Sequence, residues 1–217
     1  MRTNKQIIET CKKYSWVSVE RLMTNIESVE YVNKEGIPGD IVEIGVWKGG
    51  SMLAMMMAHE RGAEPPHRLF HLYDTFEGMT PAAEVDKDLN GYSATTMMKT
   101  DMGIWCISSL YEVKGNIEHH TEIVPKYHVG DILKNTFIPE QIAVLRLDTD
   151  WYESTKHELA TFYDSVSPGG IVIIDDYGHW EGCKKAVDEF LEVHPEITLR
   201  TTDYTGRWFY KPKAGVQ

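Results

Sequence analysis

Short runs of β-branched and other apolar residues alternate with helical segments along most of the chain. Five runs predict buried strands, over 40–46, 68–74, 123–131, 142–150 and 171–176. Segments of helical character lie between or after them, over 52–60, 151–166 and 182–194. Two final runs, 197–203 and 206–211, are joined by a short turn and predict a closing β-hairpin. Because strands and helices alternate from residue 40 onward, we expect one α/β layer with a mainly parallel sheet.

The first 36 residues predict a helical segment that precedes the sheet. Within 5–35, six apolar residues recur at helical spacing: Val19, Leu22, Met23, Ile26, Val29 and Val32. Gly36, Pro38 and Gly39 then end the helix. The chain therefore divides into 1–36, an N-terminal helical segment, and 37–217, a domain built on the sheet.

Charge and composition exclude several classes of protein. Lys plus Arg give 22 and Asp plus Glu give 33, so the formal charge is 22 − 33 = −11, which disfavours nucleic-acid binding. No apolar run is long enough for a signal peptide or a membrane helix, so we expect no membrane association. Three cysteines without a C-x-x-C spacing indicate a reducing compartment, and we expect a cytoplasmic protein.

Acidic residues stand at the end of every one of the five predicted strands. They are Glu43, Asp74, Asp131, the pair Asp148 and Asp150, and the pair Asp175 and Asp176. One acidic residue after a strand is usually a helix cap or a loop turn. In a parallel sheet, however, the carboxyl ends of the strands meet at one edge, where ligands bind. Five acidic strand ends therefore indicate a site at that edge.

The first turn has the composition of a cofactor-binding loop. The run E-I-G-V-W-K-G-G-S places Gly45, Gly49 and Gly50 between a strand and a helix, so that a ligand can approach the backbone. Asp74 ends the second strand, where a carboxylate can accept both ribose hydroxyls, and Asp131 ends the third, near the adenine edge. Together they indicate an adenosine pocket without a pyrophosphate cradle. A tight strand–helix turn without a ligand is the alternative interpretation of the glycine run.

The aspartates at 148, 150, 175 and 176 indicate a cation site. Several carboxylates without a Cys or His companion suit a hard cation such as Mg²⁺, and disfavour zinc. The structural alternative is that Asp150 caps the helix after it and that Asp176 forms a turn with Gly178.

Long motifs in these regions resemble those of the TylF/MycF macrocin O-methyltransferase family. The motifs are LRLDTDWYESTKHEL, SPGGIVIIDDYGHWEGCKKAVDEF, PGDIVEIGVWKGGS, YDTFEGM and GRWFYK, and the resemblance runs from about residue 16 to 211. It implies the class I methyltransferase sheet of seven strands with a reversed last strand. It also implies two cofactors, S-adenosylmethionine and Mg²⁺, and a small-molecule sugar or glycoside as methyl acceptor. We expect residues 77–104 to form a lid, and we expect a homodimer or a higher oligomer.

The resemblance also assigns roles to single residues. The cofactor residues it implies are Glu43, Gly45, Val46, Gly50, Ser51, Asp74, Thr75, Phe76, Asp131 and Ile132. Asp148, Asp175 and Asp176 match the metal ligands of the family, and Asp150 matches its general base. His179 follows the aspartate pair, and we expect it to assist catalysis by orienting the substrate.

Three other functions stay open on the sequence alone. Asp148-Thr149-Asp150 is also the D-x-D pattern of a metal-dependent glycosyltransferase. A catechol- or phenol-type O-methyltransferase would share both cofactors and differ only in its acceptor. A module that binds adenosine without catalysis would not need the four aspartates.

Overall fold

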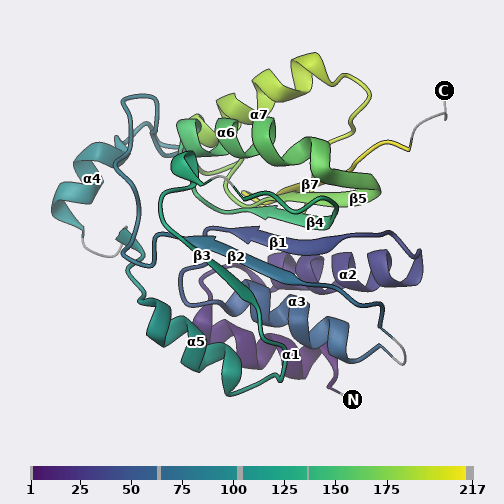
Figure 1. Cartoon of the computed structure of the whole chain (residues 1–217). Coiled ribbons are helices and arrows are strands. Elements are labelled where there is room, and N and C mark those ends of the chain that lie inside the picture. Colours follow the sequence, from purple (N-terminus) through teal and green to yellow (C-terminus); the bar gives the residue numbers. More distant parts are fainter. Residues whose placement is uncertain (1, 63–64, 102–104, 136, 214–217) are drawn as a thin grey trace.

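A seven-stranded sheet forms the centre of the molecule, with helices on both of its faces (Figure 1). The computed structural model describes residues 2–62, 65–101, 105–135 and 137–213. The strands are β1 (Asp40–Ile44), β2 (Phe70–Asp74), β3 (Lys126–Val129), β4 (Ile142–Leu147), β5 (Val166–Ile174), β6 (Arg200–Thr201) and β7 (Arg207–Tyr210). Their order across the sheet is β3-β2-β1-β4-β5-β7-β6. The first five are parallel, while β7 runs antiparallel to both β5 and β6, so the predicted α/β sheet and hairpin are confirmed and the complete sheet is mixed.

The helices form two layers. On one face lie α1 (Asn4–Cys11), α2 (Val19–Lys34), α3 (Gly50–Glu60) and α5 (Leu110–Glu118), and on the other lie α6 (Tyr152–Phe162) and α7 (Glu181–Val193) (Figure 1). The short helix α4 (Ala94–Thr100) stands to one side, in the connection between β2 and α5. Within the described residues, no helix is both long and apolar enough to cross a membrane.

The methionine-rich helix α3 is enclosed on all sides. Met52, Met55, Met56 and Met57 are buried, because α1 and α2 both pack against α3 on this face of the sheet. A helix with apolar residues on all of its faces must be covered by other elements on all of them. The N-terminal helical segment therefore completes the core of the domain.

The N-terminal segment is two helices rather than one, because the chain is extended at Ser15 and at Ser18. The Ser18 hydroxyl accepts a hydrogen bond from the backbone N–H of Arg21 at 3.0 Å and so begins α2. The short 3₁₀ turn Lys12–Tyr14 (η1) approaches the start of α3 so closely that a Cβ at Gly50 would lie 2.6 Å from the Tyr14 carbonyl oxygen. Residues 14–17 are thereby held above the first turn of α3, beside the carboxyl edge of the sheet.

The S-P-G-G run at 167–170 lies inside β5, although its composition predicts a turn before the strand. Gly169 has a φ of +83°, and its N–H donates to the Lys211 carbonyl oxygen at 2.8 Å. The register with β4 shifts here between the pairs Ile142–Val166 and Val144–Ile171. The strand thus continues through a bulge, which a glycine at positive φ permits.

Helix α5 was absent from the sequence-based prediction, although its start carries a recognisable signal. The Ser109 hydroxyl accepts a hydrogen bond from the backbone N–H of Glu112, in the S-x-x-E spacing of a capping box. Val113 and Ile117 are buried residues of this helix. Within the described residues of 75–101, the α-helix is α4, which contains the methionine pair Met97 and Met98.

The segment predicted as a lid is anchored near Asp86 to the starts of helices α6 and α7. The buried Asp86 carboxylate accepts from the backbone N–H of Ala83 at 2.7 Å and of Tyr152, the first residue of α6, at 2.9 Å. Gly182 in α7 leaves the space for it, since a Cβ there would lie 1.8 Å from Asp86 Oδ1. Residues 102–104 of the segment lie outside the described residues.

Replacing Gly182 with alanine therefore tests this anchor. We expect Gly182→Ala to lower the free energy of unfolding by roughly 2 kcal/mol, because the new methyl group must displace the Asp86 carboxylate. The matched control is Gly115→Ala in α5, where a Cβ meets no atom within 4 Å and alanine should stabilise the helix by about 1 kcal/mol. Urea denaturation of both variants measures the difference, and equal effects would contradict the anchoring role.

Candidate functional site

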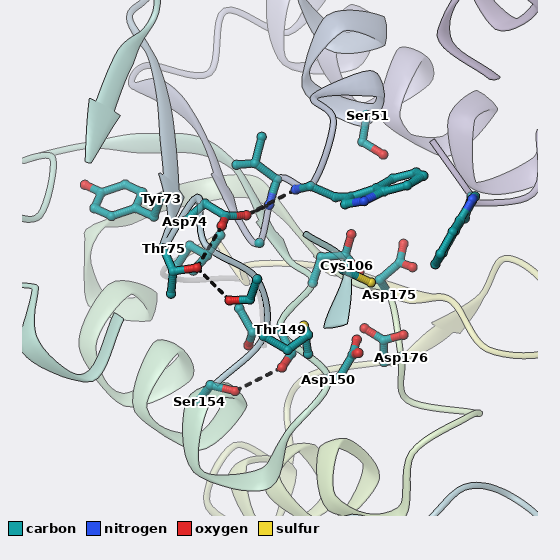
Figure 2. A pocket seen from close by; sticks show the side chains of 18 of the residues that line it. Ser51, Tyr73, Asp74, Thr75, Cys106, Thr149, Asp150, Ser154, Asp175 and Asp176 are labelled. Carbon is teal, nitrogen blue, oxygen red and sulfur yellow. Dashed lines mark hydrogen bonds between the residues drawn. The ribbon is translucent and has the colours of Figure 1, made fainter. Parts of the chain in front are cut away.

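A pocket opens at the carboxyl edge of the parallel strands, where the sequence predicted a ligand site (Figure 2). Its walls come from the β1–α3 turn, the end of β2, the β4–α6 loop, the end of β5 and residues 14–21 of the N-terminal segment. Figure 2 shows Asp74 and Thr75 on one side of the pocket, and Asp150, Asp175 and Asp176 on another. The pocket thus joins the predicted cofactor residues to the predicted cation residues.

Asp74 fixes the glycine turn to the end of β2. One of its carboxylate oxygens accepts from the backbone N–H of Val46 at 2.7 Å and of Trp47 at 3.1 Å, and the other accepts from Phe76 at 2.7 Å. Burial raises the pKa of the Asp74 carboxyl, and these backbone N–H groups oppose that rise. Asp74 therefore has a fixed orientation in the pocket wall.

Gly45 allows the ends of β1 and β4 to approach each other. It has a φ of +83°, and a Cβ at this position would lie 1.9 Å from the Asp148 carbonyl oxygen. No other residue type could occupy it without moving the β4–α6 loop. The first glycine of the turn thus also places the first aspartate of the cation group.

Most of the predicted cofactor residues line the pocket. They are Gly45, Val46, Gly50, Ser51, Asp74, Thr75 and Ile132. Glu43 and Phe76 are buried behind the wall. The Asp131 carboxylate turns to its own loop, where it accepts from the Leu133 N–H at 3.0 Å and pairs with Lys134 at 3.2 Å, while its neighbours Gly130 and Ile132 contribute to the lining.

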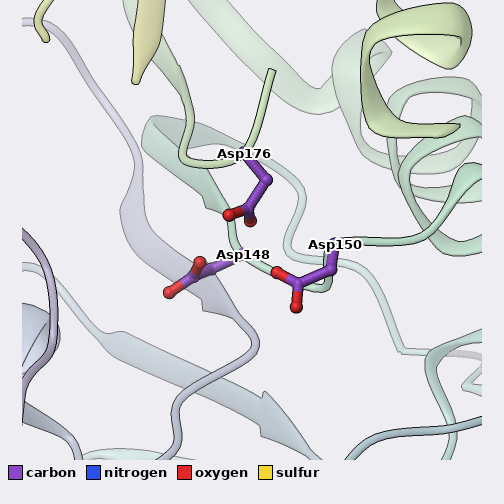
Figure 3. A group of neighbouring side chains, drawn as sticks. All are labelled: Asp148, Asp150 and Asp176. Carbon is purple, nitrogen blue, oxygen red and sulfur yellow. The ribbon is translucent and has the colours of Figure 1, made fainter. Parts of the chain in front are cut away.

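Asp148, Asp150 and Asp176 point toward one another (Figure 3). Each offers a carboxylate oxygen, and these oxygens all lie within 4.8 Å of one another. Asp176 Oδ2 is buried and has no hydrogen-bond partner. Within the described ranges, these three form the one group of acidic, His or Cys side chains with such spacing. Three converging oxygens, one of them unpartnered, fit a hard divalent cation such as Mg²⁺.

Burial and like charge raise the pKa values of this group. Burial raises the pKa of Asp150 to about 7, a hydrogen bond with Asp176 opposes the rise, and the charges of Asp148 and Asp175 add to it. The pKa of Asp176 is raised well above its ordinary value, first by burial and then by the charge of Asp150. Without a cation, the group therefore retains protons that isolated carboxyls would have lost.

Asp175 is engaged elsewhere, by two arginines that the sequence analysis did not single out. Arg146 Nη2 donates to Asp175 Oδ1 at 2.5 Å, and Arg21 Nη1 pairs with Asp175 Oδ2. Arg146 is fully buried and also contacts Glu43 at 2.9 Å and Asp148 at 2.6 Å. An arginine inside the otherwise apolar run of β4, two positions before an aspartate, is the signal that could have identified it. The structure thus groups Asp150, rather than Asp175, with Asp148 and Asp176.

His179 lies beside this site and is not among the residues that line the pocket. Its backbone N–H donates to the Asp176 carbonyl oxygen at 3.0 Å, and its Nδ1 lies 3.4 Å from the Tyr204 hydroxyl. Burial lowers the pKa of its imidazole, and the Asp88 carboxylate opposes that change. His179 thus lies outside the cation group, of which Asp150 is a member.

The sheet order, the glycine turn and the pocket define an α/β methyltransferase. The O-methyltransferase NovP superposes with a TM-score of 0.77 and 30% sequence identity, over 92% of this chain and 83% of that one. The calicheamicin methyltransferase CalS11 superposes with a TM-score of 0.64 at 19% identity, over 97% of this chain and 94% of that one, which supports the fold alone.

The chain belongs to the macrocin O-methyltransferase (TylF) family, whose sequence profile matches residues 10–211. It is 33% identical over 181 residues to a rhamnosyl-tetracenomycin C 4′-O-methyltransferase of Streptomyces olivaceus, covering 82% of this chain and 67% of the relative. It is 32% identical over 185 residues to demethyldecarbamoylnovobiocin O-methyltransferase of Streptomyces niveus, again covering 82% and 67%. The resemblance inferred from the motifs is thereby confirmed, and the chain is an O-methyltransferase.

The raised pKa of Asp150 predicts how the stability of the cation-free protein depends on pH. A carboxyl whose pKa is higher in the folded state stabilises the fold fully below its unfolded pKa, and this contribution is lost as pH rises through the folded value of about 7. We expect the free energy of unfolding in EDTA to fall between about pH 4 and pH 7, and to fall less in Asp150→Asn. Each unit of pKa shift corresponds to about 1.4 kcal/mol.

Urea denaturation across this pH range measures the effect. Asp188→Asn is the control, because Asp188 lies on α7 and pairs with Lys184 outside the pocket. The same pH dependence in Asp150→Asn and in the wild type would exclude Asp150 as the titrating group.

Proposed function

We propose that this enzyme transfers a methyl group from S-adenosylmethionine to a hydroxyl of a sugar, in a reaction that depends on Mg²⁺. The observation that carries the proposal is the position of Asp148, Asp150 and Asp176 in the pocket that Asp74 and the glycine turn also line. Binding of S-adenosylmethionine alone does not require such a group of carboxylates. A hydroxyl acceptor, in contrast, must be oriented and deprotonated.

The cofactor half of the pocket is assigned to the glycine turn and to Asp74. We infer that Asp74 and Thr75 bind the ribose, that Ile132 contacts the adenine, and that Gly45 and Ser51 lie along the methionine portion. Asp74 suits this role because the backbone N–H groups of Val46, Trp47 and Phe76 hold its carboxylate in place. The cofactor supplies an activated methyl group on a sulfonium, which needs no acid to leave.

The cation half is assigned to the aspartates. Asp148 and Asp176 are the ligands on which the family resemblance and the geometry agree. The third is Asp175 if the resemblance holds in detail, whereas the positions of the side chains favour Asp150. When bound, Mg²⁺ lowers the pKa of a hydroxyl that contacts it.

Asp150 is the group best placed to remove the proton from the acceptor. Its carboxylate lines the pocket beside Asp148 and Asp176, so it would lie next to a hydroxyl that contacts the cation. The acceptor hydroxyl would give its proton to an Asp150 oxygen, and its oxygen would take the methyl group as the S–CH3 bond breaks and the sulfur leaves as a neutral thioether.

The acceptor class rests on the relatives. The two enzymes from Streptomyces are named for a rhamnosyl-tetracenomycin and a novobiocin precursor, and a 26% identical enzyme of Micromonospora griseorubida, which matches over 83% of this chain and 71% of its own, is named for mycinamicin III. We infer a small-molecule glycoside or nucleotide-linked sugar as acceptor here. An oligomer and a cytoplasmic location remain predictions from the sequence.

A methyl-transfer assay tests the acceptor class. Labelled S-adenosylmethionine is incubated with the enzyme and with nucleotide-linked deoxysugars, aryl glycosides or caffeic acid. We expect labelled sugar products that disappear in EDTA and return with Mg²⁺, because the aspartates need a cation to bind the acceptor hydroxyl. Methylation of caffeic acid alone would favour the catechol-type alternative, and cation-independent transfer would contradict the role of Mg²⁺.

Replacing Asp150 with asparagine tests its assignment as the base. We expect Asp150→Asn to lower kcat by about 10²- to 10⁴-fold and to leave the Kd for S-adenosylmethionine unchanged, because only the proton acceptor is lost. Asp188→Asn on the surface of α7 serves as the control and should retain wild-type kcat. Calorimetry with Mn²⁺ on the same variants shows whether Asp150 is also a ligand. Near-normal turnover by Asp150→Asn would contradict the assignment.

A further inference from the structure

The loop between β4 and α6, residues 148–151, presents Asp150 to the pocket in a left-handed backbone conformation. Asp150 has a φ of +66°, and it is among the residues that line the pocket. A residue other than glycine keeps such a conformation only where the structure around it holds it there. The contacts that hold this loop therefore also decide where the Asp150 carboxylate points.

Thr149, between the two aspartates, carries the contacts of the loop with α6. Its carbonyl oxygen accepts from the Trp151 N–H at 2.7 Å and from the Ser154 hydroxyl at 3.3 Å (Figure 2). Its hydroxyl donates to Glu158 Oε1 at 2.6 Å. The first two partners lie in the loop and in the first turn of the helix, whereas Glu158 lies further along α6. The contact with Glu158 thus ties the loop to the interior of the domain.

Glu158 is a buried carboxyl that an ordinary core position would not require. Its side chain is fully buried, and its Oε2 has no hydrogen-bond partner. Burial raises the pKa of Glu158 to about 8, the hydrogen bond from Thr149 opposes the rise, and the charges of Asp148 and Asp150 add to it. An apolar side chain of similar size would cost less free energy to bury here. The position of Glu158 therefore points to a role in the site rather than in the stability of the core.

We propose that Glu158 is a positioning residue, which acts through the Thr149 hydroxyl to hold the β4–α6 loop so that Asp150 faces the acceptor hydroxyl. Glu158 is not among the residues that line the pocket, whereas Thr149 and Asp150 both are. Its effect on the reaction therefore passes through Thr149. This inference rests on the proposed function, because it takes Asp150 as the group that receives the proton.

Replacing Glu158 with methionine separates positioning from stability. Methionine has a similar unbranched length and no oxygen to accept from Thr149. We expect kcat for methyl transfer to fall roughly ten- to a hundredfold in Glu158→Met, because a released loop misplaces Asp150. The Kd for S-adenosylmethionine should not change, since Asp74 and the glycine turn are unaltered. The free energy of unfolding should stay the same or rise, because a buried carboxyl is removed. A merely structural role predicts instead that stability falls together with kcat.

Glu158→Gln is the conservative variant, and Glu153→Met is the matched control. Glutamine keeps an oxygen that can accept from the Thr149 hydroxyl, and it is neutral, as a carboxyl with a pKa of about 8 mostly is at pH 7. We expect it to restore kcat to near the wild-type value. Glu153 is exposed on the same helix, so its replacement with methionine should leave kcat unchanged. A loss in Glu158→Gln as large as that in Glu158→Met would overturn the proposal.

A double-mutant cycle with Thr149→Val tests the path through the hydroxyl. Valine has the shape of threonine without the hydroxyl, and this variant keeps the proposal testable if Glu158→Met does not fold. We expect Thr149→Val to lose as much kcat as Glu158→Met, and the double variant to lose no more than either single variant, because one contact is removed in each case. Losses that multiply in the double variant would show independent roles and overturn the proposal.

Hydrogen exchange in the cation-free protein tests the loop without any reaction. The Trp151 amide, which donates to the Thr149 carbonyl oxygen, should exchange faster in Glu158→Met and in Thr149→Val than in the wild type, while the Leu145 amide of β4 should not. No methyl transfer by the wild type would overturn the proposed function and this inference with it. Normal transfer by the wild type, with unchanged kcat or unchanged Trp151 exchange in Glu158→Met, would overturn the role of Glu158 alone.

Discussion

The guanidinium of Arg146 holds together the ends of three neighbouring strands. It contacts Glu43 in β1, Asp148 after β4 and Asp175 after β5, and its side chain is fully buried. Like charges at adjacent strand ends would otherwise repel one another. The buried Arg146 guanidinium therefore permits the acidic carboxyl edge to form without a metal. Removing one partner from such a buried set commonly costs about 3–5 kcal/mol, because the remaining charges lose their compensation. The glycine turn, the β4–α6 loop and the position of Asp175 all depend on this arrangement.

The N-terminal helices complete the domain in two ways. They pack against α3, which makes its methionines part of the core, and they bring residues 14–21 to the mouth of the pocket. Stability and site geometry are therefore linked, because the same segment supplies apolar cover and a charged side chain. The hydrogen bond from the Tyr152 N–H to the Asp86 carboxylate likewise fixes the segment after β2 to the start of α6, behind the site.

The strand ends and the motifs predicted much of the candidate site. Gly45, Asp74, Asp148, Asp150 and Asp176 all lie where the alternation of strands and helices places them, since parallel strands bring their carboxyl ends to one edge. The relation between Asp150 and Asp175 could not be predicted in this way. It depends on the directions of two side chains, and two arginines from distant parts of the chain decide the direction of Asp175. Helix α5 and the bulge at Gly169 were missed for local reasons, a short capping signal and a glycine pair that resembles a turn.

The sequence by itself determined the layer architecture, the family and the chemical character of the site, because hydrophobic periodicity and residue type are local properties of the chain. Only the tertiary structure decided which carboxylates face one another and which are neutralised by arginine. The physical reason is that a charge interacts with whatever lies within a few ångströms of it, and those neighbours come from residues far apart in the sequence. Arg21 lies more than a hundred positions before both Arg146 and Asp175, and these side chains meet because the start of α2 and the ends of β4 and β5 lie at the same edge of the molecule.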